Sequence, residues 1–352
     1  MAGGSGERFW PLSTATRPKQ LLRLTNPDRT MIEEAVDRLV PIVGVDGVFI
    51  STTIPLAGPI GAAGVVDESR ILAEPLRRNT LGALVWVVAS LLSRGETEAS
   101  VAIVTADHAI GEPSRFAGTV SAALEAAELT GGLVTIGVTP DRAETGYGYI
   151  ERDETAVSLT DGRLAHAARS FREKPDAATA KEYVEAGRFL WNAGMFFFTV
   201  PGFQNSLAAT QPEAAAILAQ VAEKLKAGDA KGAEETFAGL ESISFDYAVM
   251  EKADTVHVVE SDFPWDDVGA WDALERTLGT NDEGNVIVGP AAALDSKGCV
   301  VYNETSNLAV GICGLENVVV VVTPTGVLVC PKDDVQRVRE IGRAAQAALQ
   351  GS

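Results

Sequence analysis

The chain has 352 residues, 46% of them hydrophobic, which suffices to bury one large domain and one smaller domain. Its formal net charge of −19 excludes the basic face of nucleic-acid binders, so a local group of cations or a metal must meet any anionic ligand. No apolar run is long enough to cross a bilayer, no signal peptide opens the chain, and three cysteines suit no disulfide framework or zinc site, so we expect a cytoplasmic protein without a membrane partner.

The chain opens with a stretch rich in glycine and cations over residues 3–20. Its glycine segment consists of Gly3, Gly4, Ser5 and Gly6, and its cations are Arg8, Arg17 and Lys19. Because glycine has no Cβ, backbone N–H groups of such a segment can converge on an anion. A guanidinium and an ammonium close by would neutralise phosphate oxygens. We therefore predict a cradle for a nucleoside triphosphate.

Two familiar phosphate loops do not fit this spacing. No Lys-Ser or Lys-Thr pair follows a glycine, as a P-loop requires, and Phe9 stands where a dinucleotide fingerprint needs its third glycine. The segment from Gly3 to Gly6 alone is equally typical of a flexible chain end. The attached Trp10-Pro11 pair and residues 17–20, Arg-Pro-Lys-Gln, favour the cradle.

Strands and helices alternate over the next third of the chain. Residues 30–33, Thr-Met-Ile-Glu, form a capping box that predicts the start of a helix. Short buried strands are predicted over 48–51, 71–75, 101–104 and 133–138, with helices starting near 81 and 113. This alternation predicts an α/β, doubly wound, mostly parallel sheet of Rossmann-like (GT-A-like) type. Ligands of such sheets bind at the carboxyl ends of the strands, where Glu74, Asn79 and Asp107 fall.

The remainder of the chain changes character twice. A capped helix over 176–186 and a helical, peripheral region over 212–240 precede a strand over 255–260. From about Gly284 the chain is Val-rich, which predicts a small all-β, β-helix-like unit. Its predicted strands are 285–288, 299–302, 317–322 and 327–330, and a final helix is predicted over 334–349. We expect a catalytic domain over 1–282 and a C-terminal β unit with its helix over 283–352.

Nine stretches, in order, resemble the mannose-1-phosphate guanylyltransferases, also called GDP-mannose pyrophosphorylases, of the sugar nucleotidyltransferase family. They are AGGSGERFWPLS, RPKQ, EPLRRNT, TADH, ETGYGYIE, EKPD, LWNAGMF, DYAVMEK and WDDVGAW. The RPKQ, EPLRRNT and WDDVGAW variants favour the guanylyl branch over the thymidylyl and uridylyl ones. The resemblance implies transfer of GMP from GTP to α-D-mannose 1-phosphate, giving GDP-mannose and pyrophosphate. Such a reaction needs no protein nucleophile, only positioning and charge neutralisation.

The resemblance also implies the roles of individual residues. Arg8 would meet the β- and γ-phosphates and Lys19 the α-phosphate and the leaving pyrophosphate, while Asp107 and Asp267 would hold Mg²⁺. Asp266 is adjacent, but its side chain should point elsewhere. Taken alone, an Asp after a strand is more often a helix cap than a metal ligand. The occurrence of both aspartates within matched stretches reverses that preference.

The remaining implied roles concern the sugar and the base. Lys174 would meet the phosphate of mannose 1-phosphate, although a solvated lysine before a proline is its plainer explanation. The sugar hydroxyls would be bound by Glu173, Asn192 and the backbone around Gly146. The guanine and ribose would be surrounded by Glu74, Asn79 and Thr80, which also read as a strand end followed by a helix cap.

Two features of the chain's extent bear on these expectations. Family members carry an apolar strand directly before the glycine loop, whereas this chain begins at Met1-Ala2, so we expect a gap in the sheet and a loop without its anchor. The length leaves no room for the isomerase domain of bifunctional relatives, which favours a short monofunctional form. The Val-rich β unit could form a homodimer surface or simply a buried core. Two alternatives stay open, namely a transferase for another sugar 1-phosphate or base and an inactive nucleotide-sugar-binding homologue.

Overall fold

The computed structural model describes residues 1–350, and its centre is a six-stranded sheet with the order β3-β8-β5-β9-β7-β6. Its strands are β3 (Ser100–Ile103), β5 (Leu133–Val138), β6 (Gly148–Ser158), β7 (Leu164–Glu173), β8 (Phe189–Thr199) and β9 (Val256–Glu260). Strands β3, β5 and β9 run in one direction, as predicted for this α/β class, while β8 lies antiparallel between β3 and β5. The long β6–β7 hairpin adds a further antiparallel pair at the edge.

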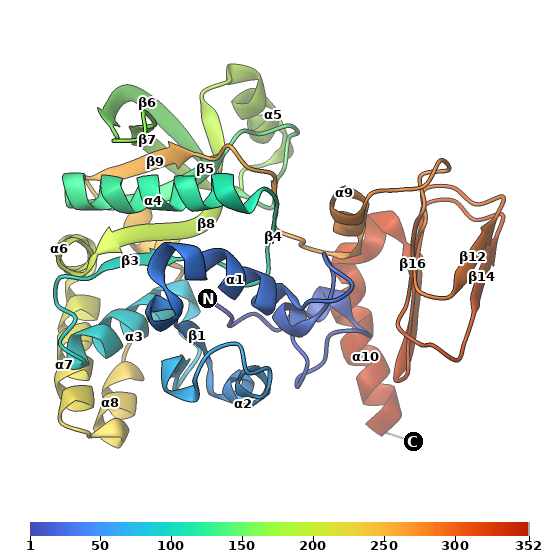
Figure 1. Ribbon diagram of the computed structural model, residues 1–352, viewed down its shortest axis with the longest axis horizontal. Helices are drawn as coiled ribbons and strands as arrows, with labels where there is room; N and C mark the ends of the chain where they lie inside the picture. Colours follow the sequence, from blue (N-terminus) through green and yellow to red (C-terminus); the bar gives the residue numbers. More distant parts are fainter. Residues whose placement is uncertain (351–352) are drawn as a thin grey trace.

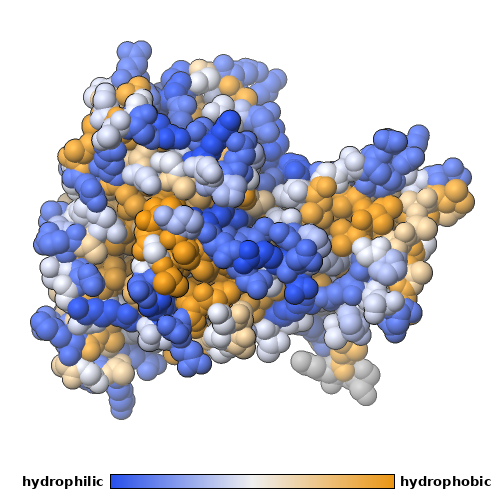
Figure 2. Space-filling view, viewed as in Figure 1, coloured by the Kyte–Doolittle hydropathy of each residue, from blue (hydrophilic) through white to orange (hydrophobic). Residues whose placement is uncertain are grey.

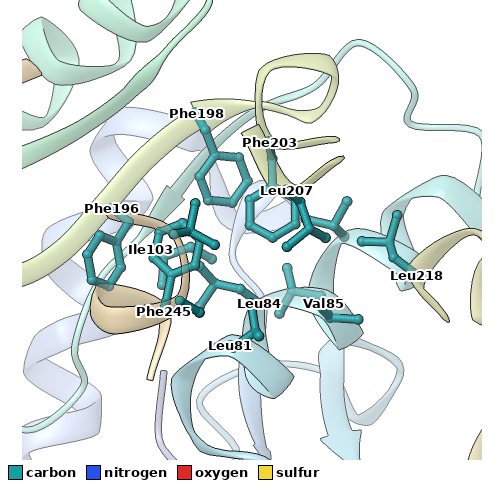
Figure 3. Close-up of a cluster of buried hydrophobic side chains, with 14 of the residues drawn as sticks. Leu81, Leu84, Val85, Ile103, Phe196, Phe198, Phe203, Leu207, Leu218 and Phe245 are labelled. Atoms are coloured by element: carbon teal, nitrogen blue, oxygen red, sulfur yellow. The ribbon is translucent and has the colours of Figure 1, made fainter. Parts of the chain in front are cut away.

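Helices cover both faces of this sheet (Figure 1). The helices of this part are α1 (Met31–Val43), α2 (Ile54–Ala62), α3 (Asn79–Ser93), α4 (Pro113–Thr130), α5 (Ala177–Ala186), α6 (Val200–Thr210), α7 (Pro212–Lys226) and α8 (Ala230–Phe237). Alternate residues of β8 point to opposite cores, because side chains alternate along a strand. Phe197 packs in the cluster with α4 residues such as Phe116. Phe196 and Phe198 enter the larger cluster with α3, α6 and α7, part of which Figure 3 shows.

Local signals in the sequence fix several helix ends. Thr30 and Glu33 form the predicted capping box at the start of α1. Asp176 accepts a hydrogen bond from the backbone of Thr179 at the start of α5, and Gly187 ends that helix in a left-handed conformation. Both patterns satisfy backbone groups that a helix end leaves without partners. The predicted boundaries of these elements therefore agree with the structure within one or two residues.

A second, smaller sheet lies beside the large one. It consists of β1 (Ile50–Thr53) and β2 (Ile71–Glu74), which pair in parallel. Met1 and Ala2 bridge the two sheets, because the N–H of Ala2 donates to Ser51 (2.7 Å) and the N–H of Ala106 donates to the carbonyl of Met1 (3.0 Å). Next to this bridge lies an apolar cavity of about 410 Å³ between β1 and β3. Among residues 1–350, β1 and β3 belong to separate sheets, and no strand pairs with both of them.

The C-terminal β unit lies at one end of the long axis (Figure 1). It contains two sheets, β11-β13-β15-β16 and β12-β14, in which every pair except β15–β16 is parallel. The strands are β11 (Val286–Val288), β12 (Ala291–Leu294), β13 (Val300–Asn303), β14 (Val310–Cys313), β15 (Val318–Thr323) and β16 (Gly326–Pro331). The short strands β12 and β14 were not predicted, since β12 is made largely of alanine and β14 contains a glycine, and neither residue favours a strand. Apolar side chains gather on the visible face of this unit (Figure 2).

The final predicted helix is divided in two. A 3-10 segment (Lys332–Arg337) precedes α10 (Val338–Gln350), which packs against the 3-10 turn Glu7–Phe9 of the glycine loop. The remaining strands are the short β4 (Ala109–Ile110) and β10 (Trp265–Asp266), and the remaining α-helix is the short α9 (Leu274–Leu278). No helix among residues 1–350 is long and apolar enough to cross a membrane.

Candidate active site

A two-residue ladder brings together aspartates that are far apart in the sequence. Strand β4 pairs antiparallel with β10, and the register places Asp266 opposite Ala109. Asp107 and Asp267 therefore lie on the segments that flank the same short ladder. The structure thus joins the strand end after β3 to the WDDVGAW stretch, which is the pairing that the two predicted metal ligands require.

Lys19 links these two segments from a buried position. Its side-chain ammonium lies 3.1 Å from the Asp107 carboxylate and donates to the backbone carbonyl of Asp267 at 2.7 Å. Burial by itself would raise the pKa of Asp107, but the charge and the hydrogen bond of Lys19 outweigh it, and the pKa lies below its ordinary value. Asp107 is therefore ionised at neutral pH and available to a cation.

The neighbouring aspartates Asp266 and Asp267 have separate partners. Asp266 is 9% exposed and accepts hydrogen bonds from the Arg276 guanidinium and from the N–H of Val268 (2.7 Å). Asp267 instead accepts a 2.7 Å hydrogen bond from the Tyr147 hydroxyl. Val268, which follows the two aspartates, has a φ of 47°, an uncommon conformation for a β-branched residue. As predicted, the Asp266 side chain points away from Asp267.

These two carboxylates, of Asp107 and Asp267, suit a magnesium ion. Among residues 1–350, no group of three or more His, Cys, Asp or Glu side chains is arranged to hold a metal by itself. Mg²⁺ is commonly bound by one or two carboxylates, with phosphate oxygens and water as the other ligands. Asp107 and Asp267 fit that pattern, because they adjoin the predicted phosphate cradle.

Aromatic rings form one wall of the site. Tyr147 makes edge-on contacts with Trp191 and Trp265, and the Arg142 guanidinium lies 4.9 Å from the Trp191 ring centroid. The indole N–H of Trp265 donates to Nδ1 of His108 at 3.0 Å, and burial lowers the pKa of His108. His108 is therefore a neutral packing residue. The Tyr147 hydroxyl was missed by sequence reasoning, which assigned only backbone contacts to the ETGYGYIE stretch.

The glycine segment contacts both parts of the site. Gly6 has a φ of 64°, and a Cβ there would lie 2.4 Å from the Cβ of Lys19, so only glycine permits this approach. Gly3 and Gly4 are exposed and uncrowded, and Ser5 is half-buried. The Arg8 guanidinium donates to the carbonyl of Gly269 at 3.1 Å. The segment from Gly3 to Arg8 therefore borders Lys19 and the WDDVGAW stretch.

The loop after these glycines is held by the C-terminal half of the chain. Phe9 and Leu12 are buried in a cluster with Trp271 and with Val300 and Leu328 of the β unit. Arg17, which we had grouped with the phosphate-binding cations, forms an ion pair with Glu304 instead. The expectation that this loop has no anchor is thus wrong, because packing downstream of the glycines holds it in place.

The three residues predicted to surround the base lie at the end of β2 and the start of α3. Glu74 is 7% exposed, and its Oε2 has no hydrogen-bond partner among residues 1–350. Burial raises the pKa of Glu74 to about 7, although Arg77 opposes this shift. Asn79 has a φ of 60° and accepts from the N–H of Thr80, whose hydroxyl oxygen in turn accepts from the N–H of Phe245 at 2.8 Å. Glu74 is the member of this group with a buried polar atom that lacks a hydrogen-bond partner.

The residues predicted to bind the sugar come from β7 and β8. Glu173 ends β7, and its carboxylate lies 2.8 Å from the ammonium of Lys174, whose side chain is largely exposed. Asn192 lies in β8, and its amide donates to Asp246 at 3.0 Å. Gly146 is exposed, and its N–H donates to Glu144 at 3.1 Å. Asp246 belongs to the DYAVMEK stretch, to which sequence reasoning assigned no role.

Comparison with known proteins agrees with this architecture. Residues 1–281 match the family model described as "Nucleotidyl transferase", and residues 289–343 match a "MannoseP isomerase/GMP-like beta-helix domain". The chain belongs to the nucleotidyl transferase family. A crystal structure described as mannose-1-phosphate geranyltransferase from Thermus thermophilus is similar to this nucleotidyl transferase, with a TM-score of 0.87, 37% identity and 98% coverage of both chains.

Curated relatives of this nucleotidyl transferase confirm the resemblance drawn from the nine stretches. The xanthan biosynthesis protein XanB of Xanthomonas campestris pv. campestris (strain B100) is 36% identical over 350 residues, which cover 97% of this chain and 71% of the relative. The mannose-1-phosphate guanylyltransferase of Escherichia coli (strain K12) is 34% identical over 355 residues, with the same two coverages, 97% and 71%.

Proposed function

We propose that the chain transfers GMP from GTP to α-D-mannose 1-phosphate, giving GDP-mannose and pyrophosphate. The observation that carries this proposal is the placement of Asp107 and Asp267 on either side of the buried Lys19 ammonium, beside the glycine segment. Among relatives that cover nearly the whole chain, several are described as mannose-1-phosphate guanylyltransferases. A phosphate oxygen of the sugar phosphate attacks the α-phosphorus in line, and the bond from that phosphorus to the leaving pyrophosphate breaks.

In this proposal, the residues around Lys19 act on the triphosphate. The backbone of Gly3, Gly4, Ser5 and Gly6 approaches the phosphates, and Arg8 neutralises the β- and γ-phosphates. Lys19 meets the α-phosphate, where negative charge is redistributed as pyrophosphate leaves. Asp107 and Asp267 hold Mg²⁺, which when bound neutralises phosphate oxygens that the cations do not reach. Tyr147 orients the Asp267 carboxylate through its hydroxyl.

The two substrates bind on opposite sides of this centre. Glu74, Asn79 and Thr80 surround the guanine and ribose, and the unpartnered Oε2 of Glu74 can accept from the base when ionised. The exposed ammonium of Lys174 binds the phosphate of mannose 1-phosphate. Glu173, Asn192 and the backbone at Gly146 bind sugar hydroxyls. We further propose a domain boundary near residue 282, a cytoplasmic location and a homodimer formed through the exposed apolar side chains of the β unit, among them Val327 and Val329.

The test is pyrophosphate release from a panel of sugar 1-phosphates combined with each nucleoside triphosphate and Mg²⁺. We expect the highest kcat/KM for mannose 1-phosphate with GTP. Turnover of glucose 1-phosphate with UTP or dTTP alone would instead make the protein a transferase for another sugar and base. Binding of GTP or GDP-mannose without any turnover would make it an inactive nucleotide-sugar-binding homologue.

A further inference from the structure

Asp246 occupies an unusual turn beside the proposed substrate residues. It is the first residue of a π-helical turn (Asp246–Met250). This conformation is rare in proteins as a whole but is often found at functional sites. The preceding residue, Phe245, is buried, and its N–H donates to the hydroxyl oxygen of Thr80. This turn therefore connects the residues proposed to bind the base with those proposed to bind the sugar.

One hydrogen bond fixes how Asp246 faces Asn192. The Oδ1 atom of Asn192 accepts from the N–H of Gly194 at 3.2 Å and lies 3.0 Å from the Thr135 hydroxyl. Its amide nitrogen must therefore point the other way, where it donates to Oδ1 of Asp246 at 3.0 Å. The second carboxylate oxygen of Asp246 has no hydrogen-bond partner among residues 1–350, and it is not sealed from solvent. One acceptor oxygen of Asp246 is thus available to a ligand.

Glu173 and Lys174 lie near enough to Asp246 for their charges to act on its carboxylate. Gly148 lies across from Glu173 in the β6–β7 hairpin, and a Cβ on Gly148 would lie 2.5 Å from Oε2 of Glu173. The glycine therefore makes room for the Glu173 carboxylate. Burial raises the pKa of Asp246 to about 6, with a further contribution from Glu173, while Asn192 and Lys174 oppose it. At neutral pH the Asp246 carboxylate is mainly ionised and can only accept hydrogen bonds.

We propose that Asp246 binds a hydroxyl of the sugar and is a specificity-determining residue for the sugar 1-phosphate. This inference rests on the proposed function. An ionised carboxylate needs a donor, and the donors that a sugar phosphate offers are its hydroxyls. With its phosphate on Lys174, the sugar lies between Glu173 and the Asn192–Asp246 pair, where the free oxygen of Asp246 accepts from a ring hydroxyl. Asn192 holds the carboxylate in orientation, so the hydroxyl is recognised by position as well as by charge.

The experiment pairs variants of the protein with analogues of the substrate. Wild type, Asp246→Ala and the shape-conserving Asp246→Asn are assayed with mannose 1-phosphate and its 2-, 3-, 4- and 6-deoxy analogues at saturating GTP. Glu251→Gln removes an exposed carboxylate next to the same turn and is the matched control. In wild type, we expect the analogue without the recognised hydroxyl to lose roughly ten- to a hundredfold in kcat/KM.

The variants then show whether Asp246 causes that loss. For Asp246→Ala we expect kcat/KM with mannose 1-phosphate to fall by a comparable factor, while the KM for GTP stays unchanged. The analogue that lacks the recognised hydroxyl should then show no additional loss in kcat/KM with this variant. Asp246→Asn, which can no longer accept in the same way, should reduce the discrimination too, and Glu251→Gln should retain it. If both Asp246 variants discriminate against every analogue as wild type does, Asp246 does not bind the sugar. Absence of wild-type turnover with mannose 1-phosphate overturns the proposed function itself, and this inference with it.

Discussion

The adjacent aspartates allow a metal-binding role to be separated from a structural one. We predict that Asp267→Asn abolishes most Mg²⁺-dependent turnover without loss of stability, whereas Asp266→Asn lowers stability and leaves much of the activity. The reason is that Asp267 is bound by the Tyr147 hydroxyl at the site, while Asp266 is buried against Arg276. The two substitutions are chemically identical and lie one residue apart, so each serves as the control for the other.

The magnitudes follow from these contacts. Each charged hydrogen bond of Asp266 contributes about 1.5–3 kcal/mol, but the Arg276 side chain is 37% exposed, which screens the pair. We therefore expect Asp266→Asn to cost about 2–3 kcal/mol in free energy of unfolding. At about 2.1 cal/mol/K per residue, this lowers Tm by roughly 3–4 °C for a chain of 352 residues. Removing the Asp267 charge should lower kcat by about 10²–10³-fold, as for loss of one electrostatic contact to a transition state.

The assay combines thermal unfolding with pyrophosphate release over a range of Mg²⁺ concentrations. Asp267→Asn should keep the wild-type Tm within about one degree, given the usual small effect of substitutions outside buried networks. Asp266→Asn should lose less than about tenfold in kcat. Near-normal turnover of Asp267→Asn would refute the metal assignment. Equal activity losses at both positions, without a difference in Tm, would show that activity depends on the β4–β10 pairing and not on the Asp267 carboxylate in particular.

Three further predictions concern the loop, the sugar phosphate and the base. Gly6→Ala should lower the free energy of unfolding by at least about 2 kcal/mol, because the alanine Cβ would lie 2.4 Å from the Cβ of Lys19 at a φ of 64°. Gly4→Ala, at an uncrowded position, is the control and should change denaturant unfolding little. Lys174→Ala should raise the KM for mannose 1-phosphate about tenfold or more and leave the KM for GTP unchanged, and equal changes in both would contradict a phosphate contact. As pH rises from about 4.5 to 7, the free energy of unfolding of Glu74→Gln should increase by about 1–3 kcal/mol relative to that of wild type. The reason is that the pKa of Glu74 is raised from 4.5 to about 7 in the folded state, so ionisation of the carboxyl destabilises folded wild type but not the variant. A stability difference that does not change over this pH range would show that burial does not raise that pKa.

Much of the fold could be predicted because its signals are local. The capping box at Thr30, the cap at Asp176 and the stop at Gly187 each depend on residues within one helical turn. The alternation of strands and helices likewise indicated the α/β class. The antiparallel position of β8 was not predicted, because direction within a sheet depends on which edges pair, and no local pattern encodes that choice.

The sequence by itself determined which chemical groups the site contains. The glycine segment, Lys19, Asp107 and Asp267 all stand in recognisable stretches, since a phosphate site needs small backbone, cations and carboxylates. Only the tertiary structure decided how these groups are joined. The β4–β10 ladder brings the segments of Asp107 and Asp267 together, and hydrogen bonds from Arg276 direct the Asp266 carboxylate away from Asp267. Arg17 forms an ion pair with Glu304. Most of these contacts link residues more than a hundred positions apart, and their energies depend on burial and geometry that exist only once the chain has folded.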